Sequence, residues 1–546
     1  MHARMEAAPA VQSSRLVTPS GSRLSKREIL TWLLAAASYY AAMLLVVGSP
    51  LLDNDSYQYL SVTSNILSGA GMTTDIPFFE SELRHGVIPA PVTTFPPGYP
   101  IAIAALQFFG LRPQLAAVTV SITSGALAVA MVGLICRRLR MDPIVSRYVL
   151  FIFGANASTL TYSISILSES LFTLVVTAAL LAFLASRAVG ASRTAYAIAI
   201  LSGLAVGVAT WVRYAGLFVF AGLVLALVMD LAIARTRRAF YCLISVGLSA
   251  TVLIAPLIVR NILLTGTWRG GNTVASEDGA AWTLMKGATG LAWLAVGNGT
   301  TAVAVAAQIT VGIVAAAALT RLRRWFHTPA LNLVATVLAV YIVAIVLASL
   351  NSPIDIGARL LFPALPLISL TGGLVVWRLH RGGARRHRPV VPRALTMIGA
   401  CAYFISGCTC LDLPYSPPHH GVYQKLAAPL EDGSRAIDWL AARNTPEAPV
   451  MATESQATSY ALQRPVVGMA EARYSSTRWD EATVVSVIRQ YHARYLILYT
   501  NPDEVSGRSV QSESPFLASL LAGRSVAGFS VAARSREVII FEHRGR

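Results

Sequence analysis

Two aspartates, Asp53 and Asp55, flank Asn54 a few residues beyond the first long apolar run of the sequence. Two carboxylates at the mouth of a membrane protein suit two kinds of chemistry. They can bind a divalent cation, or one of them can accept a proton as a general base. A structural alternative stays open, because Asp55 directly precedes a helix-like run, Tyr57 to Leu67, whose N–H groups its side chain could cap.

Three arginines and a glutamate stand at the ends of other apolar runs. Arg213, Arg260 and Arg359 carry planar guanidinium groups, which suit bidentate contact with a phosphate. Glu169 is suited to bind a metal or to orient the base. Each has a structural alternative, since arginines also snorkel to lipid headgroups and a glutamate can neighbour a helix N-cap. Their predicted placement on one face favours a shared site.

The composition places these residues in a membrane protein. Of 546 residues, 55% are hydrophobic and only 13% are charged, against roughly 25% charged residues in soluble proteins. Apolar runs of about 20 residues recur, and such runs must be helical in lipid. We predict about eleven spans. They lie at 29–49, 114–136, 146–162, 167–186, 195–211, 215–232, 239–259, 291–320, 329–350, 360–378 and 394–411.

The formal net charge of +17 comes mainly from arginine clusters between the apolar runs. With the N-terminus in the cytoplasm, every cluster falls on the cytoplasmic side, which is the usual positive-inside bias and predicts an external C-terminus. No single basic domain is present, which argues against a nucleic-acid partner. The clusters are Arg137 to Arg140, Arg235 to Arg238, Arg321 to Arg324 and Arg378 to Arg393.

The predicted fold class is a membrane all-α bundle followed by an extracytoplasmic α/β domain. Residues 1–28 form a cytoplasmic tail, and 29–411 form the transmembrane domain with a large first external loop at 50–113. Within that loop, 101–109 is too short for a span and predicts a helix in the interface. Residues 412–546 alternate predicted helices and strands, which indicates a small α/β domain. Its expected helix is 436–442, and its expected strands are 449–452, 495–499 and 538–542.

The stretch from Asp53 to Gly71, together with Thr93 to Pro100, resembles the first external loop of GT-C glycosyltransferases. The nearest branch is that of the aminoarabinose transferases and protein O-mannosyltransferases. The resemblance implies a polyprenyl-phosphate sugar donor and catalysis on the outer face of the membrane. It assigns Asp55 as the catalytic carboxylate, with Asp53 as a neighbouring candidate, and it places Tyr59 and Tyr99 in substrate binding.

Other segments resemble the same family in the same order along the chain. The resemblance adds Arg213, Arg260 and Arg359 to the substrate-binding residues and Glu169 as a candidate metal ligand. One departure from the family concerns the loop motif. The family usually has Asp-Lys-Pro-Pro where this chain has Thr94-Phe95-Pro96-Pro97. The lysine is missing, so its role in holding phosphate cannot be assigned to this chain. The similar segments are Leu167 to Phe172, Trp211 to Gly216, Ala255 to Asn261 with Gly266, Ala358 to Pro366, Asp438 to Leu440, Tyr460 and Arg464-Pro465.

The prediction is therefore a multi-pass enzyme of the bacterial inner membrane, a hexosyl- or pentosyltransferase of the GT-C type. Its partners would be a polyprenyl-phosphate-linked sugar, membrane lipids and a lipid, glycan or protein acceptor. The one cofactor considered is a divalent cation, Mg²⁺ or Mn²⁺. Two alternatives are a transporter or flippase of lipid-linked sugars, which usually needs ionisable groups deep in the membrane and internal repeats, and a non-catalytic assembly protein.

Overall fold

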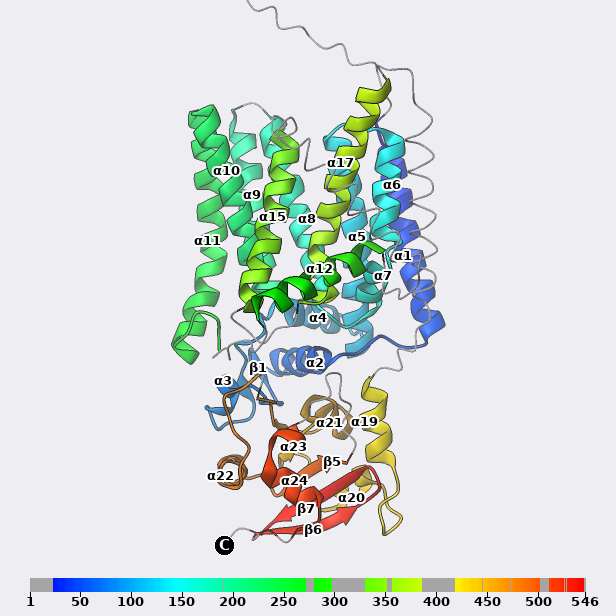
Figure 1. Cartoon of the computed structure of the whole chain (residues 1–546), viewed down its shortest axis with the longest axis vertical. Coiled ribbons are helices and arrows are strands. Elements are labelled where there is room, and N and C mark those ends of the chain that lie inside the picture. The colour runs from blue at the N-terminus through cyan, green and yellow to red at the C-terminus, as the bar shows by residue number, and fades with distance from the viewer. Residues whose placement is uncertain are drawn as a thin grey trace, which may run out of the picture.

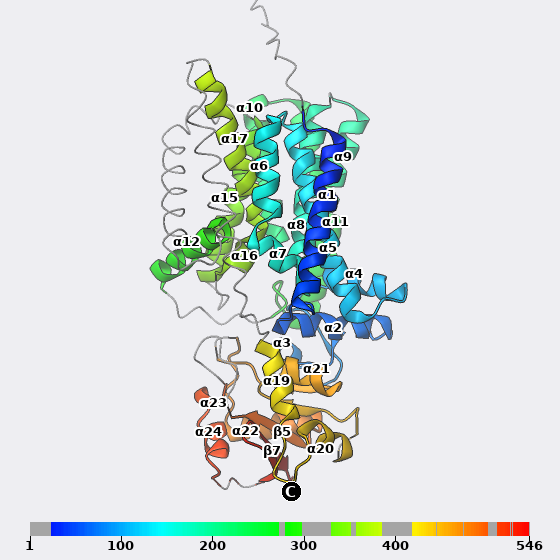
Figure 2. The same cartoon turned by 90° about the vertical axis from the view of Figure 1, so that its right-hand side faces the viewer.

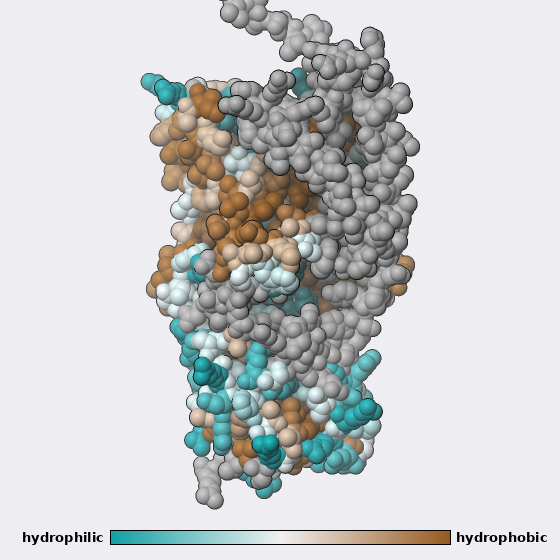
Figure 3. Space-filling view, viewed as in Figure 1, coloured by the Kyte–Doolittle hydropathy of each residue, from teal (hydrophilic) through white to brown (hydrophobic). Residues whose placement is uncertain are grey.

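The computed structural model divides into a helical bundle and a C-terminal domain, with short elements of the first loop between them (Figure 1). It describes residues 23–544 except 190, 272–278, 297–328, 351–355, 385–417, 444, 473, 501–509, 525 and 527. Apolar side chains cover the visible part of the bundle, whereas polar side chains are frequent over the C-terminal domain (Figure 3). The membrane therefore surrounds the bundle and leaves the C-terminal domain in water.

Eight helices among the described residues are long and apolar enough to cross a membrane. Local signals set their ends: the first begins at a Ser25–Glu28 capping box and ends at Gly48, whose φ of +84° suits glycine. They are α1 (Lys26–Val47), α5 (Pro113–Arg138), α8 (Glu169–Ala188), α9 (Arg193–Val212), α10 (Gly216–Ala234), α11 (Arg237–Thr265), α15 (Pro329–Leu350) and the run of α16 (Ala358–Leu361), η1 (Phe362–Ala364) and α17 (Leu365–Ala384).

The single span predicted at 146–162 is wrong. The chain forms α6 (Pro143–Gly154) and then a separate α7 (Ala157–Ile164), because the Asn156 side chain accepts a hydrogen bond from Ser158 N–H and starts a new helix. At 1.5 Å per residue, α6 covers only about 18 Å. The predicted span 394–411 and most of 291–320 fall outside the described residues, so the count of eleven stays a prediction.

One helix of the bundle runs across it rather than through it. α12 (Ala280–Val296) lies across the ends of the spans that face the C-terminal domain, in both views of the molecule (Figures 1 and 2). Its buried residues Thr283, Gly287 and Gly290 recur at helical spacing. A β-carbon on Gly290 would lie 3.0 Å from Leu361, so the absence of a side chain lets α12 approach α16 closely.

The first loop contributes two helices that lie beside the ends of the spans, α2 and α4. Both were expected from the sequence, although α4 is shorter than a span. Phe108 and Phe109 at its end are 80% and 77% exposed, which fits a helix at the membrane interface. The loop elements are α2 (Asn54–Leu67), β1 (Thr73–Thr74), α3 (Glu80–Leu83), β2 (Ala90–Pro91) and α4 (Gly98–Phe108).

A five-stranded sheet organises the C-terminal domain, with strand order β4-β3-β5-β7-β6. β3 pairs in parallel with β4 and β5, while β7 pairs antiparallel with β5 and β6. β3, β5, β7 and helix α20 coincide with elements predicted from the sequence. The elements are α19 (Pro418–Ala427), α20 (Ala436–Arg443), β3 (Val450–Ala452), α21 (Ser455–Leu462), β4 (Val466–Gly468), α22 (Glu481–Tyr491), β5 (Tyr495–Tyr499), α23 (Val510–Glu513), α24 (Pro515–Leu521), β6 (Phe529–Arg534) and β7 (Val538–His543).

The first loop is attached to this sheet through backbone hydrogen bonds. Val466 N–H donates to the Asp75 carbonyl at 3.1 Å, and Gly468 N–H donates to the Pro77 carbonyl at 2.8 Å. These bonds satisfy the outer edge of β4, which would otherwise be an unpaired strand edge. The Tyr491 hydroxyl adds a bond to the Leu83 carbonyl at 2.9 Å. The C-terminal domain and the first loop are therefore one packed unit.

Glu82 lies fully buried in this unit, where its carboxylate accepts the N–H groups of Phe78 at 2.9 Å and Phe79 at 3.2 Å. Burial raises the pKa of Glu82 from 4.5 to about 7. The folded state therefore holds a proton that the unfolded state has released, and stability falls as the pH rises from 4.5 through 7. Because of this carboxyl, the free energy of unfolding is roughly 3 kcal/mol higher below this pH window than above it.

We expect the Glu82→Gln variant to lose this pH dependence, because the amide oxygen still accepts both N–H groups but carries no charge. Thermal unfolding of both proteins in detergent at pH 5 and pH 8.5 measures the effect. The wild type should lose more stability than the variant between the two values. Equal losses would mean that Glu82 does not change its protonation on folding.

Candidate active site

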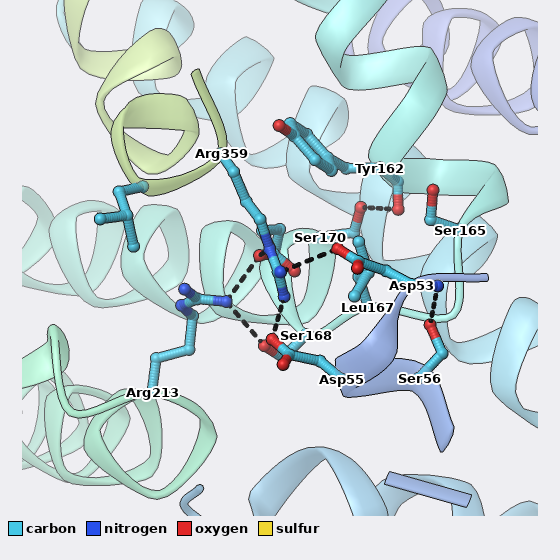
Figure 4. Close-up of polar contacts among 12 residues, drawn as sticks. Asp53, Asp55, Ser56, Tyr162, Ser165, Leu167, Ser168, Ser170, Arg213 and Arg359 are labelled. Atoms are coloured by element: carbon cyan, nitrogen blue, oxygen red, sulfur yellow. Dashed lines mark hydrogen bonds and ion pairs between the residues drawn. The ribbon is translucent and has the colours of Figure 1, made fainter. Parts of the chain in front are cut away.

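The first turn of α2 carries both aspartates of the first loop. Asp53 is the N-cap, and its carboxylate accepts Asn54 N–H at 2.7 Å, so the capping role considered for Asp55 belongs to Asp53. The turn is anchored to the bundle, because the Ser56 hydroxyl donates to the Ile166 carbonyl at 2.8 Å. The Asp55 side chain is thereby free of capping and points toward the ends of the spans (Figure 4).

The guanidinium of Arg359, on the short helix α16, contacts three carboxylates at once. Its Nη1 lies 3.0 Å from Asp53 Oδ2, its Nη2 contacts Asp55 Oδ2, and its Nε contacts Glu169 Oε1 (Figure 4). Asp53 is the most exposed of the three, with 47% of its side chain accessible, against 25% for Asp55 and none for Glu169. The starts of α2 and α8, which are distant in sequence, thus meet at the cation of α16.

A second guanidinium completes the cluster. Arg213, which follows the last residue of α9, donates from Nη1 to Glu169 Oε1 at 2.7 Å and to the Ser168 hydroxyl at 3.0 Å. The same hydroxyl lies 3.1 Å from the Tyr59 hydroxyl. The cluster holds three carboxylates and two guanidinium groups. The second oxygen of Glu169 is buried and has no hydrogen-bond partner among the residues that the structure describes.

The environment of Asp55 changes its acidity. Burial raises the pKa of Asp55 above its ordinary value, and the negative charges of Asp53 and Glu169 raise it further, whereas Arg359 opposes the shift. A carboxylate with a raised pKa binds a proton more strongly and is a better general base than an exposed aspartate. The raised pKa makes proton acceptance one of the reactions open to Asp55.

The two tyrosines predicted to bind substrate lie in contact, but only one reaches the cluster. The rings of Tyr59 and Tyr99 are 5.1 Å apart in an edge-to-face arrangement, and Phe95 packs on Tyr59 from another direction. The Tyr99 hydroxyl is fully buried and bonded to Ser121 at 2.9 Å. Tyr99 therefore supports the Tyr59 ring from behind, and it does not face the charged groups.

The structure does not bring Arg260 to the cluster, so the expectation that three arginines gather there is corrected. Its Nη1 donates to the Val92 carbonyl at 2.8 Å and its Nη2 to the Met72 carbonyl at 3.1 Å. Nearby, the Tyr214 hydroxyl donates to the Thr93 carbonyl at 2.5 Å. Arg260 holds the β1–β2 ribbon of the first loop against α11, which is a structural role.

Comparison with known proteins places this arrangement in a known fold. Residues 90–265 match the family model described as dolichyl-phosphate-mannose-protein mannosyltransferase. ArnT from Cupriavidus metallidurans, solved with undecaprenyl phosphate, is similar with a TM-score of 0.58 at 13% identity, covering 95% of this chain and 98% of that chain. The chain has a GT-C-like fold. The predicted resemblance is confirmed, and the predicted enzyme class is that of the proteins that this chain resembles.

Two further structures share the GT-C fold with this chain. The arabinofuranosyltransferase AftD from Mycobacteria has a TM-score of 0.56 at 16% identity, covering 96% of this chain and 40% of that chain. The oligosaccharyltransferase of Archaeoglobus fulgidus, solved with zinc and sulfate, has a TM-score of 0.53 at 13% identity, covering 86% of this chain and 68% of that chain. No curated protein sequence matches this chain.

The carboxylates of this site do not fit a divalent cation. In the part of the chain that the structure describes, no group of three or more His, Cys, Asp or Glu side chains is arranged to hold a metal ion. Asp53, Asp55 and Glu169 all contact Arg359, whose guanidinium occupies the position between them that a metal would need. The metal role predicted for Glu169 is not supported by this arrangement.

Two residues of the site escaped the sequence analysis. Ser168 links Tyr59 to Arg213, and its position beside Glu169 in the sequence was the available signal. Tyr341, on α15, is buried, and its hydroxyl donates to the Leu360 carbonyl at 3.0 Å, next to Arg359. A single tyrosine inside an apolar run has no sequence feature that distinguishes it from a packing residue.

Proposed function

We propose that this GT-C glycosyltransferase transfers a sugar from a polyprenyl-phosphate donor to an acceptor on the extracytoplasmic face of the membrane. The single observation that carries the proposal is the sharing of Arg359 among Asp53, Asp55 and Glu169 at the ends of the spans. A proton acceptor and two guanidinium groups are the parts that sugar transfer from a lipid phosphate needs. The solved complex of ArnT with undecaprenyl phosphate supports the choice of donor.

In the proposed reaction, Asp55 accepts the proton of the acceptor's nucleophilic group. The nucleophile forms a bond to the anomeric carbon while the bond from that carbon to the phosphate oxygen breaks. The lipid phosphate leaves with the electron pair, and Arg213 and Arg359 stabilise the negative charge that develops on it. Arg359 contacts Asp55, so a donor phosphate that binds this guanidinium competes with Asp55 for it. Donor binding then frees Asp55 to act on the acceptor.

The proposed orientation places the C-terminal domain outside and the N-terminus in the cytoplasm, in a bacterial inner membrane. Arginines at the opposite end of the bundle support it, because Arg138 donates to the Ala185 carbonyl and Arg238 donates to the Ser186, Arg187 and Val189 carbonyls. A bundle end rich in arginine usually faces the cytoplasm. The ionisable cluster lies at the other end, which is unlike a transport pathway through the middle of a membrane.

The test uses the purified full chain in lipid nanodiscs containing lipid extracted from a bacterial envelope. Polyprenyl phosphates that carry radiolabelled mannose, arabinose or aminoarabinose serve as donors. We expect label to move from at least one donor to a lipid, glycan or protein product, with release of polyprenyl phosphate. Failure of all three donors to give product, in protein whose folding is verified by its thermal unfolding, would contradict the proposal.

A further inference from the structure

Helix α2 is shared between the membrane bundle and the C-terminal domain, and its two faces have different partners. Asp55, which contacts Arg359, and Tyr59, whose hydroxyl lies 3.1 Å from the Ser168 hydroxyl, are one turn apart and face the charged cluster. Tyr57 is two residues from each of them, which is about 200° around the helix axis. Its side chain therefore points away from the cluster, and it is only 4% exposed.

The face of α2 that carries Tyr57 belongs to the core of the C-terminal domain. Tyr57 packs in one apolar cluster with Val450, Val466 and Ile497 of the sheet. The ring of Tyr460, on α21, lies 5.0 Å from the Tyr57 ring at an angle of 46°. Aromatic pairs in this arrangement stabilise a contact beyond the apolar area that they bury. The C-terminal domain thus presses on α2 from the side opposite to Asp55.

Tyr460 also contacts the bundle itself. Its hydroxyl accepts a hydrogen bond from the side-chain amide of Gln114, in the first turn of the membrane helix α5. One side chain therefore touches α2 through its ring and α5 through its hydroxyl. The arginines of the cluster do not depend on this contact, because Arg213 follows α9 and Arg359 lies on α16.

We propose that Tyr460 is a positioning residue for Asp55, acting through Tyr57 and α2. This inference rests on the proposed function, because it assigns to the C-terminal domain the task of holding α2, and with it the base, in place. Ser56 anchors the first turn of α2 to the bundle, and Tyr460 packs on Tyr57 of the same turn from the C-terminal domain. Without Tyr460, α2 is free to tilt, and Asp55 moves relative to the bound donor.

The test compares Tyr460→Ala with Tyr460→Phe in the full chain, using the donor that supports transfer in the wild type. We expect Tyr460→Ala to lower kcat roughly ten- to hundredfold, the range produced by a misplacement of about 1 Å, with KM for the donor within about threefold. Tyr460→Phe keeps the ring and should restore kcat to within about threefold of the wild type. In Tyr460→Ala, amide hydrogen exchange of residues 54–67 should be faster.

A pH profile separates positioning from a general loss of stability. Loosening α2 lets water reach Asp55, which lowers the raised pKa of this carboxyl. The fall of kcat at acidic pH, here called the acid limb, should therefore move toward lower pH in Tyr460→Ala. Ile488→Ala is the matched control, because Ile488 is buried on the other face of the sheet and does not touch α2. It should lower the melting temperature and leave both the acid limb and the exchange of 54–67 unchanged.

Three outcomes bear on the inference. An unchanged kcat in Tyr460→Ala, or an equal shift of the acid limb in Ile488→Ala, overturns it while leaving the proposed function intact. Full activity in Asp55→Asn, or unchanged exchange of 54–67 in Tyr460→Ala, also overturns the inference, whereas failure of every donor to give product contradicts the proposed function. Should Tyr460→Ala not fold, Tyr460→Leu must give a smaller change of the same sign, and wild-type behaviour there contradicts the inference.

Discussion

Replacement of Arg359 by methionine should abolish sugar transfer, with a loss of at least about a thousandfold in kcat/KM. Methionine keeps much of the apolar volume of the arginine but removes the cation that Asp53, Asp55 and Glu169 share. Glu169 would keep its ion pair with Arg213, whereas Asp53 and Asp55 would lose their ion pairs with Arg359. The departing phosphate would lose one of its two proposed guanidinium partners. The measurement is radiolabelled transfer by purified protein whose melting temperature is recorded in parallel.

The chain offers a closely matched control for this experiment. Arg187 has the same side-chain exposure as Arg359, 28%, and forms an ion pair with Asp230 at 2.7 Å, but it lies at the opposite end of the bundle. Arg187→Met should keep activity within about threefold, as expected for a partly exposed ion pair. Arg359→Lys restores the charge without the planar fork and should recover only part of the loss. A folded Arg359→Met protein with a tenth of wild-type activity would exclude the proposed role.

The Asp55→Asn substitution should lower kcat by roughly a hundred- to ten-thousandfold, the usual contribution of a general base. Asparagine has nearly the shape of aspartate and can still accept a hydrogen bond from Arg359, so the local structure should persist. Since burial raises the pKa of Asp55, wild-type activity should fall as the pH drops through that raised value, at a higher pH than for an exposed aspartate. Single-turnover transfer rates between pH 4 and pH 8 measure this fall in activity.

Asp53→Asn is the control for this second experiment, because Asp53 is the neighbouring carboxylate and the other catalytic candidate. Asparagine caps a helix about as well as aspartate, so α2 should begin at the same residue. The substitution removes one charge from the cluster and should reduce kcat by less than about tenfold. If Asp53→Asn were inactive while Asp55→Asn retained activity, the base would be Asp53, and the assignment made here would be reversed.

Most of the membrane helices could be predicted from the sequence, because an apolar run of sufficient length must form a helix in lipid regardless of its neighbours. The failure at 146–162 had a local cause, the capping side chain of Asn156, which hydropathy does not detect. The acidic residues and the arginines at span ends were also visible, since charged groups are excluded from the membrane core. Among these residues, the family resemblance singled out Asp55 as the catalytic carboxylate.

The partners of these residues could not be predicted in the same way. Arg359 meets Asp53 and Asp55 across 306 and 304 positions of sequence, and that encounter depends on the rotation and tilt of several packed helices. For the same reason Arg260, which has the same residue type and a similar place at a span end, holds a loop backbone instead. The contact of Tyr460 with α2 likewise arises only when the C-terminal domain packs against the first loop.

By itself, the sequence determined that this chain crosses the membrane many times and that its reactive groups lie at the ends of the spans. Both follow from the free energy of placing apolar or charged side chains in lipid, which each segment experiences independently. Only the tertiary structure decided which carboxylates share a guanidinium and which arginine is left out. Side-chain pairing depends on helix packing, and helix packing is a property of the whole chain.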